Sequence, residues 1–580
     1  MSEVRTFWSS IERGQPVNGE PWLAALAAAA KAEAGFDIPA ARAALDQSRP
    51  SDPAWQAVRE LLDIRVSLRE GHALSHGRLH QRLAALRGSG LDDATLARAC
   101  HTMGVLHVRR NEFEQAEASL LEALRLIDDS PSRLWILDSL GQVYQGQGAW
   151  VEARRLLKAV SALKEASGDW LGTAISAGNL ALLEIGLGHK AAAEAHLMEV
   201  LERLGPQLPP LSRLRLHTML LEAVFGTPNE MLHAAALEVA LNDAGAGSHH
   251  LKGFAQVALA RAHPADAARW LAAAEREFSA PGDLALVRYW RLRLLPKSDD
   301  DVQQVAQTRA LIRQAGGATE AELLTHLLFA ERTQGTPEMQ GHLDDAFEYA
   351  RNANNPLWAE RVDRVYERLD PKGYSQRVTE RFSGRSSAEL EKTTLEDATS
   401  IFADLVGFTA RSQELTPEET METVRSLFEL AVPLFVRFKV RPLQYQGDGL
   451  LAVCQGAGHA KRGLGFARAL VARTLRVTEV RKALGDKWGL TVRAGVASGP
   501  TVLGVLGSHY KLEFQAIGRT VNLASRIQGQ AEPGQVCAAW ATVQAAGIDT
   551  SSVHEEQAPL KGFPAPEKFA RITLSARDFE

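Results

Sequence analysis

Two aspartates in the last third of the sequence stand in strings that could hold divalent cations. Asp404 lies in FADLVGFT at 402–409, and Asp448 lies in QGDG at 446–449. Each aspartate ends an apolar, strand-like run beside a glycine-bearing turn. Carboxylates bind hard divalent cations, and glycine lets backbone N–H groups approach phosphates closely. These strings therefore indicate metal-assisted chemistry on a nucleoside triphosphate.

A third string, IGRTVNLASR at 517–526, places Asn522 and Arg526 four residues apart. On a helix these side chains share one face, where an amide and a guanidinium could stabilise charge in a transition state. Each string also has an ordinary interpretation. Asp404 could be a solvated strand end, Asp448 a hairpin-turn residue, and the Asn–Arg pair a feature of a surface helix. The joint presence of the three strings favours a functional site.

The sequence around these strings predicts alternating strands and helices. Thr416 as N-cap, Pro417 at the first helical position and Glu419 predict a capping box at the start of a helix. The expected elements are a strand at 399–405, that helix, a hairpin of 443–445 and 450–454, a helix at 460–484, and strands at 490–497 and 501–506. This β-α-β-β-α-β order predicts an α+β ferredoxin-like domain, with its helices on one face of an antiparallel sheet.

The chain from about residue 20 to 365 is predicted to be almost all helical, because alanine and leucine dominate it. Three segments share the same internal offsets, with small and apolar residues at matching positions. They are Gly104-His107-Ala116-Leu120-Ala123, Gly141-Tyr144-Ala153-Leu157-Val160 and Ala181-Glu184-Ala193-Leu197-Val200. The offsets resemble the tetratricopeptide repeat over 95–203, and the match is weak after Pro209. The resemblance implies a superhelical solenoid that binds a protein or peptide partner; a plain scaffold or a dimerisation element is the alternative.

Length and composition limit the remaining possibilities. A chain of 580 residues is too long for one core, so several domains are expected: helical repeats at 1–365, a linker at 366–395 with turns at 370–373 and 383–387, and a catalytic domain at 396–574. The net charge of −5 gives no reason to expect nucleic acid or a membrane as partner. Three scattered cysteines and the lack of a signal peptide favour a cytoplasmic protein.

Residues 396–574 resemble the catalytic domain of the class III nucleotidyl cyclases, the adenylate and guanylate cyclase family, in several separate strings that agree in order and spacing. The resemblance implies that Asp404, with Leu405 beside it, and Asp448 hold two Mg²⁺ or Mn²⁺ ions. It also implies that Asn522 orients the ribose and Arg526 meets charge on the α-phosphate. The expected phosphate-binding residues are Gly407, Phe408, Thr409, Lys561 and Arg493.

The sequence departs from the family pattern at the two positions that select the base. Adenylate cyclases usually carry a lysine where this chain has Gln444, and an aspartate, threonine or serine where it has Gln515. A primary amide both donates and accepts, so this pair could read adenine or guanine and would discriminate modestly. ATP is the expected substrate, and pyrimidine triphosphates stay open.

The chain holds one copy of each string, whereas the family joins metal aspartates from one domain to the Asn/Arg pair of another. A head-to-tail homodimer with two equivalent sites is therefore expected. The leading hypothesis is an adenylate cyclase regulated through its helical repeats. The alternatives are a catalytically silent repeat scaffold that binds nucleotide and a cyclase of relaxed or different base specificity. A diguanylate cyclase would need a turn that Gly447-Asp448-Gly449-Leu450 does not supply.

Overall fold

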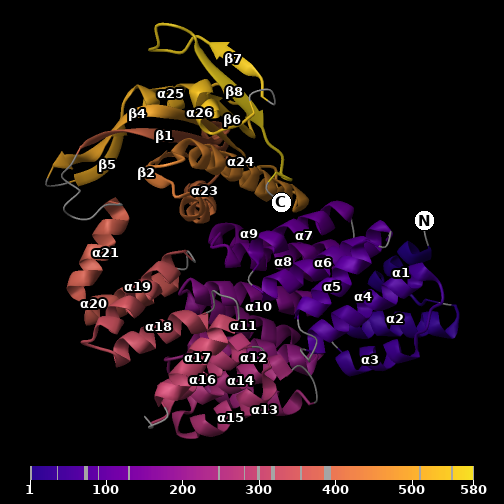
Figure 1. Ribbon diagram of the computed structural model, residues 1–580. Helices are drawn as coiled ribbons and strands as arrows, with labels where there is room; N and C mark the ends of the chain where they lie inside the picture. The colour runs from indigo at the N-terminus through magenta and orange to yellow at the C-terminus, as the bar shows by residue number, and fades with distance from the viewer. Residues whose placement is uncertain are drawn as a thin grey trace. The chain divides into compact units, whose positions relative to one another are not determined.

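A computed structural model of the chain describes most of residues 3–578. The residues outside this description are 1–2, 18, 36, 71–75, 89–90, 111, 128–130, 246–248, 280, 297–300, 315–319, 353–355, 384–392, 509–510, 550–552 and 579–580. The chain divides into two units, of which the first comprises most residues up to Trp358 and the second comprises Ala359–Glu580 with two short earlier segments. A long all-helical region followed by an α+β domain confirms the expected fold class (Figure 1).

The first unit consists of helices, most of which pack against their neighbours along the chain (Figure 1). Those up to residue 204 are α1 (Glu3–Glu12), α2 (Pro21–Ala34), α3 (Ile38–Gln47), α4 (Pro53–Glu70), α5 (His76–Arg87), α6 (Asp93–Arg109), α7 (Phe113–Leu126), α8 (Pro131–Gly146), α9 (Trp150–Ala166), α10 (Trp170–Gly186) and α11 (Lys190–Leu204). They are followed by η1 (Gly205–Gln207), α12 (Pro210–Val224), α13 (Glu230–Asp243), α14 (His249–Ala262), η2 (Pro264–Asp266), α15 (Ala267–Glu277), α16 (Pro281–Leu294), α17 (Asp301–Gln314), α18 (Glu320–Arg332) and α19 (Pro337–Asn352).

The small residues of the repeated pattern lie where two helices of a pair touch. A Cβ atom on Gly104 of α6 would be 2.5 Å from Cγ of Leu120 of α7, and one on Gly141 of α8 would be 2.6 Å from Cδ2 of Leu157 of α9. Both distances are shorter than a non-bonded carbon–carbon contact, so a side chain at either glycine would force the facing leucine to shift. The offsets seen in the sequence therefore correspond to helix-pair packing.

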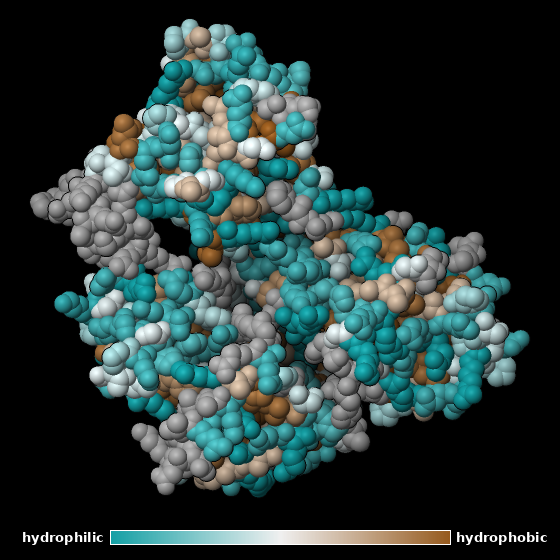
Figure 2. Space-filling model, viewed as in Figure 1, coloured by the Kyte–Doolittle hydropathy of each residue, from teal (hydrophilic) through white to brown (hydrophobic). Residues whose placement is uncertain are grey.

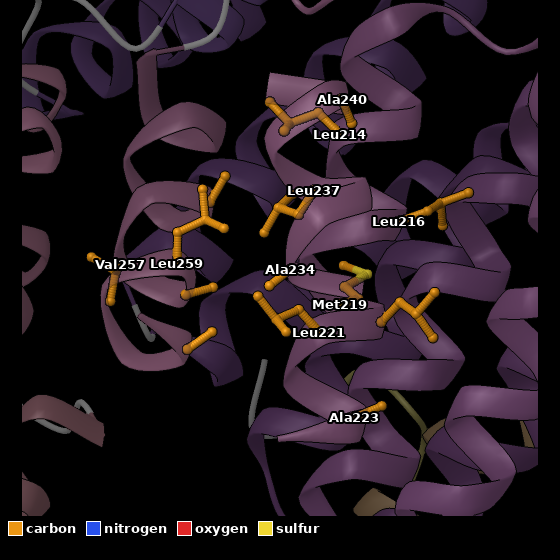
Figure 3. Close-up of a cluster of buried hydrophobic side chains, with 14 of the residues drawn as sticks. Leu214, Leu216, Met219, Leu221, Ala223, Ala234, Leu237, Ala240, Val257 and Leu259 are labelled. Carbon is orange, nitrogen blue, oxygen red and sulfur yellow. The ribbon is translucent and has the colours of Figure 1, made fainter. Parts of the chain in front are cut away.

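Helical pairing continues past the region where the repeat pattern is clear. Buried side chains of α12, α13 and α14 form one apolar cluster, which includes Leu214, Met219, Leu237 and Leu259 (Figure 3). Ala258 and Leu271 are buried in the same cluster, so helices still pack together after Pro209, where the repeat pattern is weak.

Helices α20 (Pro356–Leu369) and α21 (Pro371–Ser383) follow, so the turn expected at 370–373 narrows to Asp370 between two helices. Asp370 accepts a hydrogen bond from the Gly373 backbone N–H at 3.0 Å, as an N-cap does. The turn expected at 383–387 lies, apart from Ser383, outside the described residues.

Among the described residues, the α+β domain has eight strands, in the order β2-β3-β1-β4-β6-β8-β7 with β5 paired to β4. The elements are β1 (Thr394–Leu405), α22 (Phe408–Ser412), α23 (Pro417–Phe438), β2 (Arg441–Gln446), β3 (Gly449–Cys454), α24 (His459–Ala483), β4 (Val492–Ser508), β5 (Lys511–Ile517), α25 (Arg519–Gln528), β6 (Gln535–Ala539), α26 (Trp540–Ala545), β7 (Glu555–Ala558) and β8 (Glu567–Thr573). The core order β1-α23-β2-β3-α24-β4 confirms the ferredoxin-like prediction, and the capping box of Thr416 and Glu419 is present.

Two details of the predicted sheet are wrong. The strands expected at 490–497 and 501–506 are one strand, β4, because β1 is long enough to pair with both halves: Ala398 and Asp397 pair with Gly499 and Pro500. The sheet is mixed, since β4 and β6 run parallel. Helices α23 and α24 share one face as expected, whereas α25 covers the opposite face (Figure 1).

Hydrophilic residues cover most of the surface seen in Figure 2. Within the described ranges, no helix combines the length and apolar composition needed to cross a membrane. The cysteines Cys100, Cys454 and Cys537 are buried and unpaired with one another.

Candidate active site

Asp404 is the penultimate residue of β1, and Asp448 lies beside it. Asp404 is opposite Gly449 of β3 on one side and Arg493 of β4 on the other. Asp448 occupies the two-residue tip between β2 and β3, where Gly447 adopts the left-handed φ of +61° that such a turn requires. The backbone N–H of Leu405 donates to the Asp448 carbonyl oxygen at 3.2 Å. This bond fixes the hairpin tip against the end of β1.

Asp404 lies close enough to Asp448 to affect the protonation of the Asp448 carboxyl group. Burial and the negative charge of Asp404 raise the pKa of Asp448 above its usual value, and a hydrogen bond with the Asp404 side chain acts in the same direction. Two carboxylates that face one space repel each other unless a cation or a proton lies between them. Their position, oxygen donors and mutual repulsion fit divalent cations, which Asp404 and Asp448 would hold.

Asp404 has two further partners. Nη2 of Arg493 lies 3.2 Å from Asp404 Oδ2, and Nε2 of Gln528 donates to the same oxygen at 3.4 Å. Arg493, which sequence analysis assigned to phosphates, thus contacts a carboxylate. Gln528 was missed by sequence analysis, although it stands one turn after the buried Ala524 and so belongs to the helix face that packs on the sheet.

The close approach of α25 to the sheet depends on Gly495 of β4. A Cβ atom there would lie 2.2 Å from the Ala524 carbonyl oxygen and 2.4 Å from the Gln528 backbone nitrogen. Both neighbours are backbone atoms, which cannot rotate away. Gly495 therefore sets the distance at which α25 brings Gln528 to Asp404.

We expect Gly495→Ala to destabilise the α+β domain, because the helix must shift or the sheet must deform. Overpacking of a well-packed site costs about 1–3 kcal/mol, and a clash with backbone should fall at the upper end. Chemical unfolding followed by circular dichroism measures the change. Gly529→Ala is the matched control, since its nearest neighbour, the Arg526 carbonyl oxygen, is 3.4 Å away. Equal stability of the two variants would contradict this role of Gly495.

A turn at Gly407 follows β1. Gly407 adopts a left-handed φ of +72° and precedes the short helix α22, while Val406 N–H donates to the Thr491 carbonyl oxygen at 3.0 Å. Phe408 is half-buried and Thr409 is exposed. The turn thus directly follows Asp404 on the chain.

Asn522 and Arg526 lie on the exposed face of α25, while Val521, Ala524 and Ile527 bury the other face. Lys561 is exposed in the turn that follows Leu560. Among the contacts found between described residues, none joins these three polar side chains to Asp404 or Asp448. One copy of the chain therefore assembles the aspartate pair and presents the Asn–Arg pair outward.

The two expected base-selecting residues lie on strands that touch. Gln444 of β2 accepts a hydrogen bond from Nε2 of Gln446 at 2.6 Å, and Gln515 of β5 pairs with Gly504 of β4. The guanidinium of Arg441 lies 3.6 Å from the centroid of the Phe514 ring, which links β2 to β5. Both amides are only half-buried.

Two family models match the chain. The model described as adenylate and guanylate cyclase catalytic domain matches residues 390–571. The model described as tetratricopeptide repeat matches residues 132–204, which include the second and third copies of the repeated pattern.

Individual relatives match the C-terminal part of the chain. An adenylate cyclase of Mycobacterium tuberculosis is 29% identical over 143 residues, which are 24% of this chain and 31% of the relative. Receptor-type guanylate cyclase gcy-1 of Caenorhabditis elegans is 24% identical over 184 residues, 31% of this chain and 15% of the relative. The solved adenylyl cyclase CyaB of P. aeruginosa is 23% identical, with a TM-score of 0.30, covering 33% of this chain and 100% of that chain. This chain thus spans less than a third of these two curated relatives.

Proposed function

Because residues 390–571 are a class III nucleotidyl cyclase domain preceded by tetratricopeptide repeats at 132–204, we propose that this protein converts ATP to 3′,5′-cyclic AMP and pyrophosphate. The observation that carries the proposal is the pairing of Asp404 and Asp448 at one end of the sheet, where burial and Asp404 raise the pKa of Asp448. Such a pair is unfavourable without a counter-charge and would be stabilised by divalent cations, which can in turn bind phosphates.

The residues of the site would have separate roles in binding the ions and the triphosphate. When bound, two divalent ions would lower the pKa of the ribose 3′-hydroxyl and neutralise the leaving pyrophosphate. Asp404 and Asp448, with Leu405 beside them, would hold these ions. The turn of Gly407, Phe408 and Thr409 would direct backbone N–H groups at the triphosphate.

Two cationic side chains would complete the phosphate site. Nη2 of Arg493 lies 3.2 Å from Oδ2 of Asp404, and this guanidinium would turn to the phosphates once cations occupy the aspartates. Lys561, which is exposed, is free to reach the terminal phosphates. Arg493 and Lys561 would then both place positive charge near the pyrophosphate as it leaves.

We further propose that two copies of the chain share each site. Asn522 would orient the ribose and Arg526 would stabilise charge on the α-phosphate. The outward position of both residues on α25 supports this arrangement, because a second copy could receive them. The homodimer would thus contain two equivalent sites, each with aspartates from one copy and the Asn–Arg pair from the other.

Base choice is the open part of the proposal. The Gln444 and Gln515 amides can each donate and accept, so ATP is favoured by its abundance and by the frequency of adenylate cyclases rather than by a fixed charge. A product screen with all four nucleoside triphosphates and Mn²⁺ tests this directly. Cyclic AMP as the main product supports the proposal, whereas cyclic GMP or a cyclic pyrimidine nucleotide would assign a different base. If no triphosphate gives a product, the remaining hypothesis is a scaffold that binds nucleotide without catalysis.

Installing Lys at 444 and Asp at 515 should sharpen the choice of base. In the Gln444→Lys/Gln515→Asp variant, the lysine donates to an acceptor nitrogen of adenine and the aspartate accepts from its amino group, whereas guanine presents the reverse pattern. We expect the ratio of kcat/KM for ATP to that for GTP to rise by about tenfold or more. An unchanged ratio would mean that these positions do not contact the base.

The helical repeats would regulate the enzyme by binding a protein or peptide. Tetratricopeptide repeats at 132–204 stack helix pairs into a continuous surface, and such surfaces commonly receive a partner. Cyclase assays of the full chain and of a chain lacking the helical region, each with and without candidate partners, would measure the size and sign of this regulation.

A further inference from the structure

A cluster of metal-ligating side chains lies far along the chain from the catalytic strings, in the last helices of the first unit. His326 projects from α18, and His342 and Asp345 project from α19, one helical turn apart. One ligand atom of each residue lies within 4.8 Å of the others. Two antiparallel helices therefore bring together two imidazoles and a carboxylate, the donor types that zinc prefers.

The hydrogen bonds of the cluster fix the tautomers of both imidazoles. Nη2 of Arg309, on α17, lies 2.5 Å from Nε2 of His342. A guanidinium only donates, so Nε2 of His342 accepts and the proton of the neutral ring is on Nδ1. That proton points at Nδ1 of His326, 3.3 Å away. Nδ1 of His326 therefore carries a lone pair, and its ring is protonated at Nε2.

Acidic side chains lie close to the two imidazoles. Asp345 is near enough to His326 for its Oδ2 to lie 3.8 Å from the ring Nδ1, and its charge also acts on Glu322, one turn before His326 on the same helix. Imidazoles beside carboxylates supply the nitrogen and oxygen donors that a zinc-type ion binds.

The spacing of the nitrogen atoms matches a tetrahedral ion. Two nitrogens bound at about 2.05 Å to a tetrahedral zinc lie about 3.3 Å apart, which is the distance between the two Nδ1 atoms. We propose that Nδ1 of His326, Nδ1 of His342 and a carboxylate oxygen of Asp345 form a binding site for a zinc-type divalent ion that joins α18 to α19. Asp345 Oδ2 is 3.8 Å from His326 Nδ1, and its side chain is 67% exposed, so it can turn inward.

Arg309 regulates access to this site. Metal binding at Nδ1 of His342 moves the ring proton to Nε2, which then cannot accept from Arg309. The guanidinium must withdraw, and the freed N–H can donate to Glu338, whose charge already acts on His342 from one turn earlier on α19. Such a carboxylate partner is the usual outer contact of a zinc-bound histidine. Arg309 therefore weakens binding, both as a competing donor and as a like charge.

The test is zinc binding by the full-length protein, measured by competition with a chromophoric chelator in excess Mg²⁺. Cobalt(II) absorption in the visible range reports the coordination geometry independently. We expect one zinc equivalent that is weakened in His326→Gln and His342→Gln by more than the 10–100-fold typical of a lost outer partner. Arg309→Met should bind about tenfold more tightly because a like charge is removed.

Two further variants keep the test decisive. Asp345→Asn alters an exposed side chain, so it should fold normally and still weaken zinc binding. His250→Gln is the matched control, because His250 has one carboxylate neighbour, Asp283, at 3.1 Å, and should leave binding unchanged. Zinc affinity that is the same in His326→Gln, His342→Gln and Asp345→Asn as in the unaltered chain would overturn the proposal, as would the absence of a tetrahedral cobalt spectrum.

Discussion

An Asp448→Asn variant is expected to lose cyclic nucleotide formation by a factor on the order of 10²–10³. Divalent ions contribute several kcal/mol of transition-state stabilisation, and each 1.36 kcal/mol is tenfold in rate. Asparagine keeps the shape of the side chain but removes the charge that would hold the ion beside Asp404. The measurement is product formation with Mn²⁺ at saturating triphosphate.

The same variant should be as stable as the unaltered chain, or more stable, in the absence of divalent ions. Burial and the Asp404 charge disfavour ionised Asp448, as its raised pKa indicates, so a neutral side chain relieves repulsion. Loss of activity without loss of stability separates a functional role from a structural one. Asp397→Asn, at an exposed position on β1, the strand that carries Asp404, is the control and should retain activity. Full activity in Asp448→Asn would contradict the proposed mechanism.

Mixing two inactive variants, Asp404→Ala and Arg526→Ala, should restore activity to about a quarter of that of the unaltered protein. Random exchange of subunits makes half of the dimers mixed, and each mixed dimer contains one site with both groups intact. The expected quarter depends on sites that are built from two copies of the chain. The outward position of Arg526, on the helix that brings Gln528 to Asp404, supports such shared sites.

The matched control mixes Asp404→Ala with Asp448→Ala. Both positions belong to the same half of a site, so every site in a mixed dimer lacks one aspartate and no activity should return. Subunit exchange is verified by differently tagged copies. Recovery in the control mixture, or none in verified mixed dimers of the first pair, would show that the groups are not shared in this way.

Local sequence determined much of the α+β domain. The capping box of Thr416 and Glu419, the hairpin around Asp448 and the helix spacing of Asn522 and Arg526 each depend on residues within a few positions of one another. The contact of Gly104 with Leu120 was also readable, because a repeated offset reveals a packing rule even when the partners are on different helices. Such features could be predicted because their physical causes are short in range or periodic.

Contacts between distant segments could not be read from the sequence. Nothing near Gly499 and Pro500 shows that β4 continues through them, because the cause is a partner strand about a hundred residues earlier. The position of Arg493 on Asp404, the approach of Gln528 and the meeting of His326 with His342 likewise depend on how strands and helices pack. The sequence by itself thus determined which groups are available for chemistry, whereas the tertiary structure decided which of them meet, because side-chain distances are set by packing.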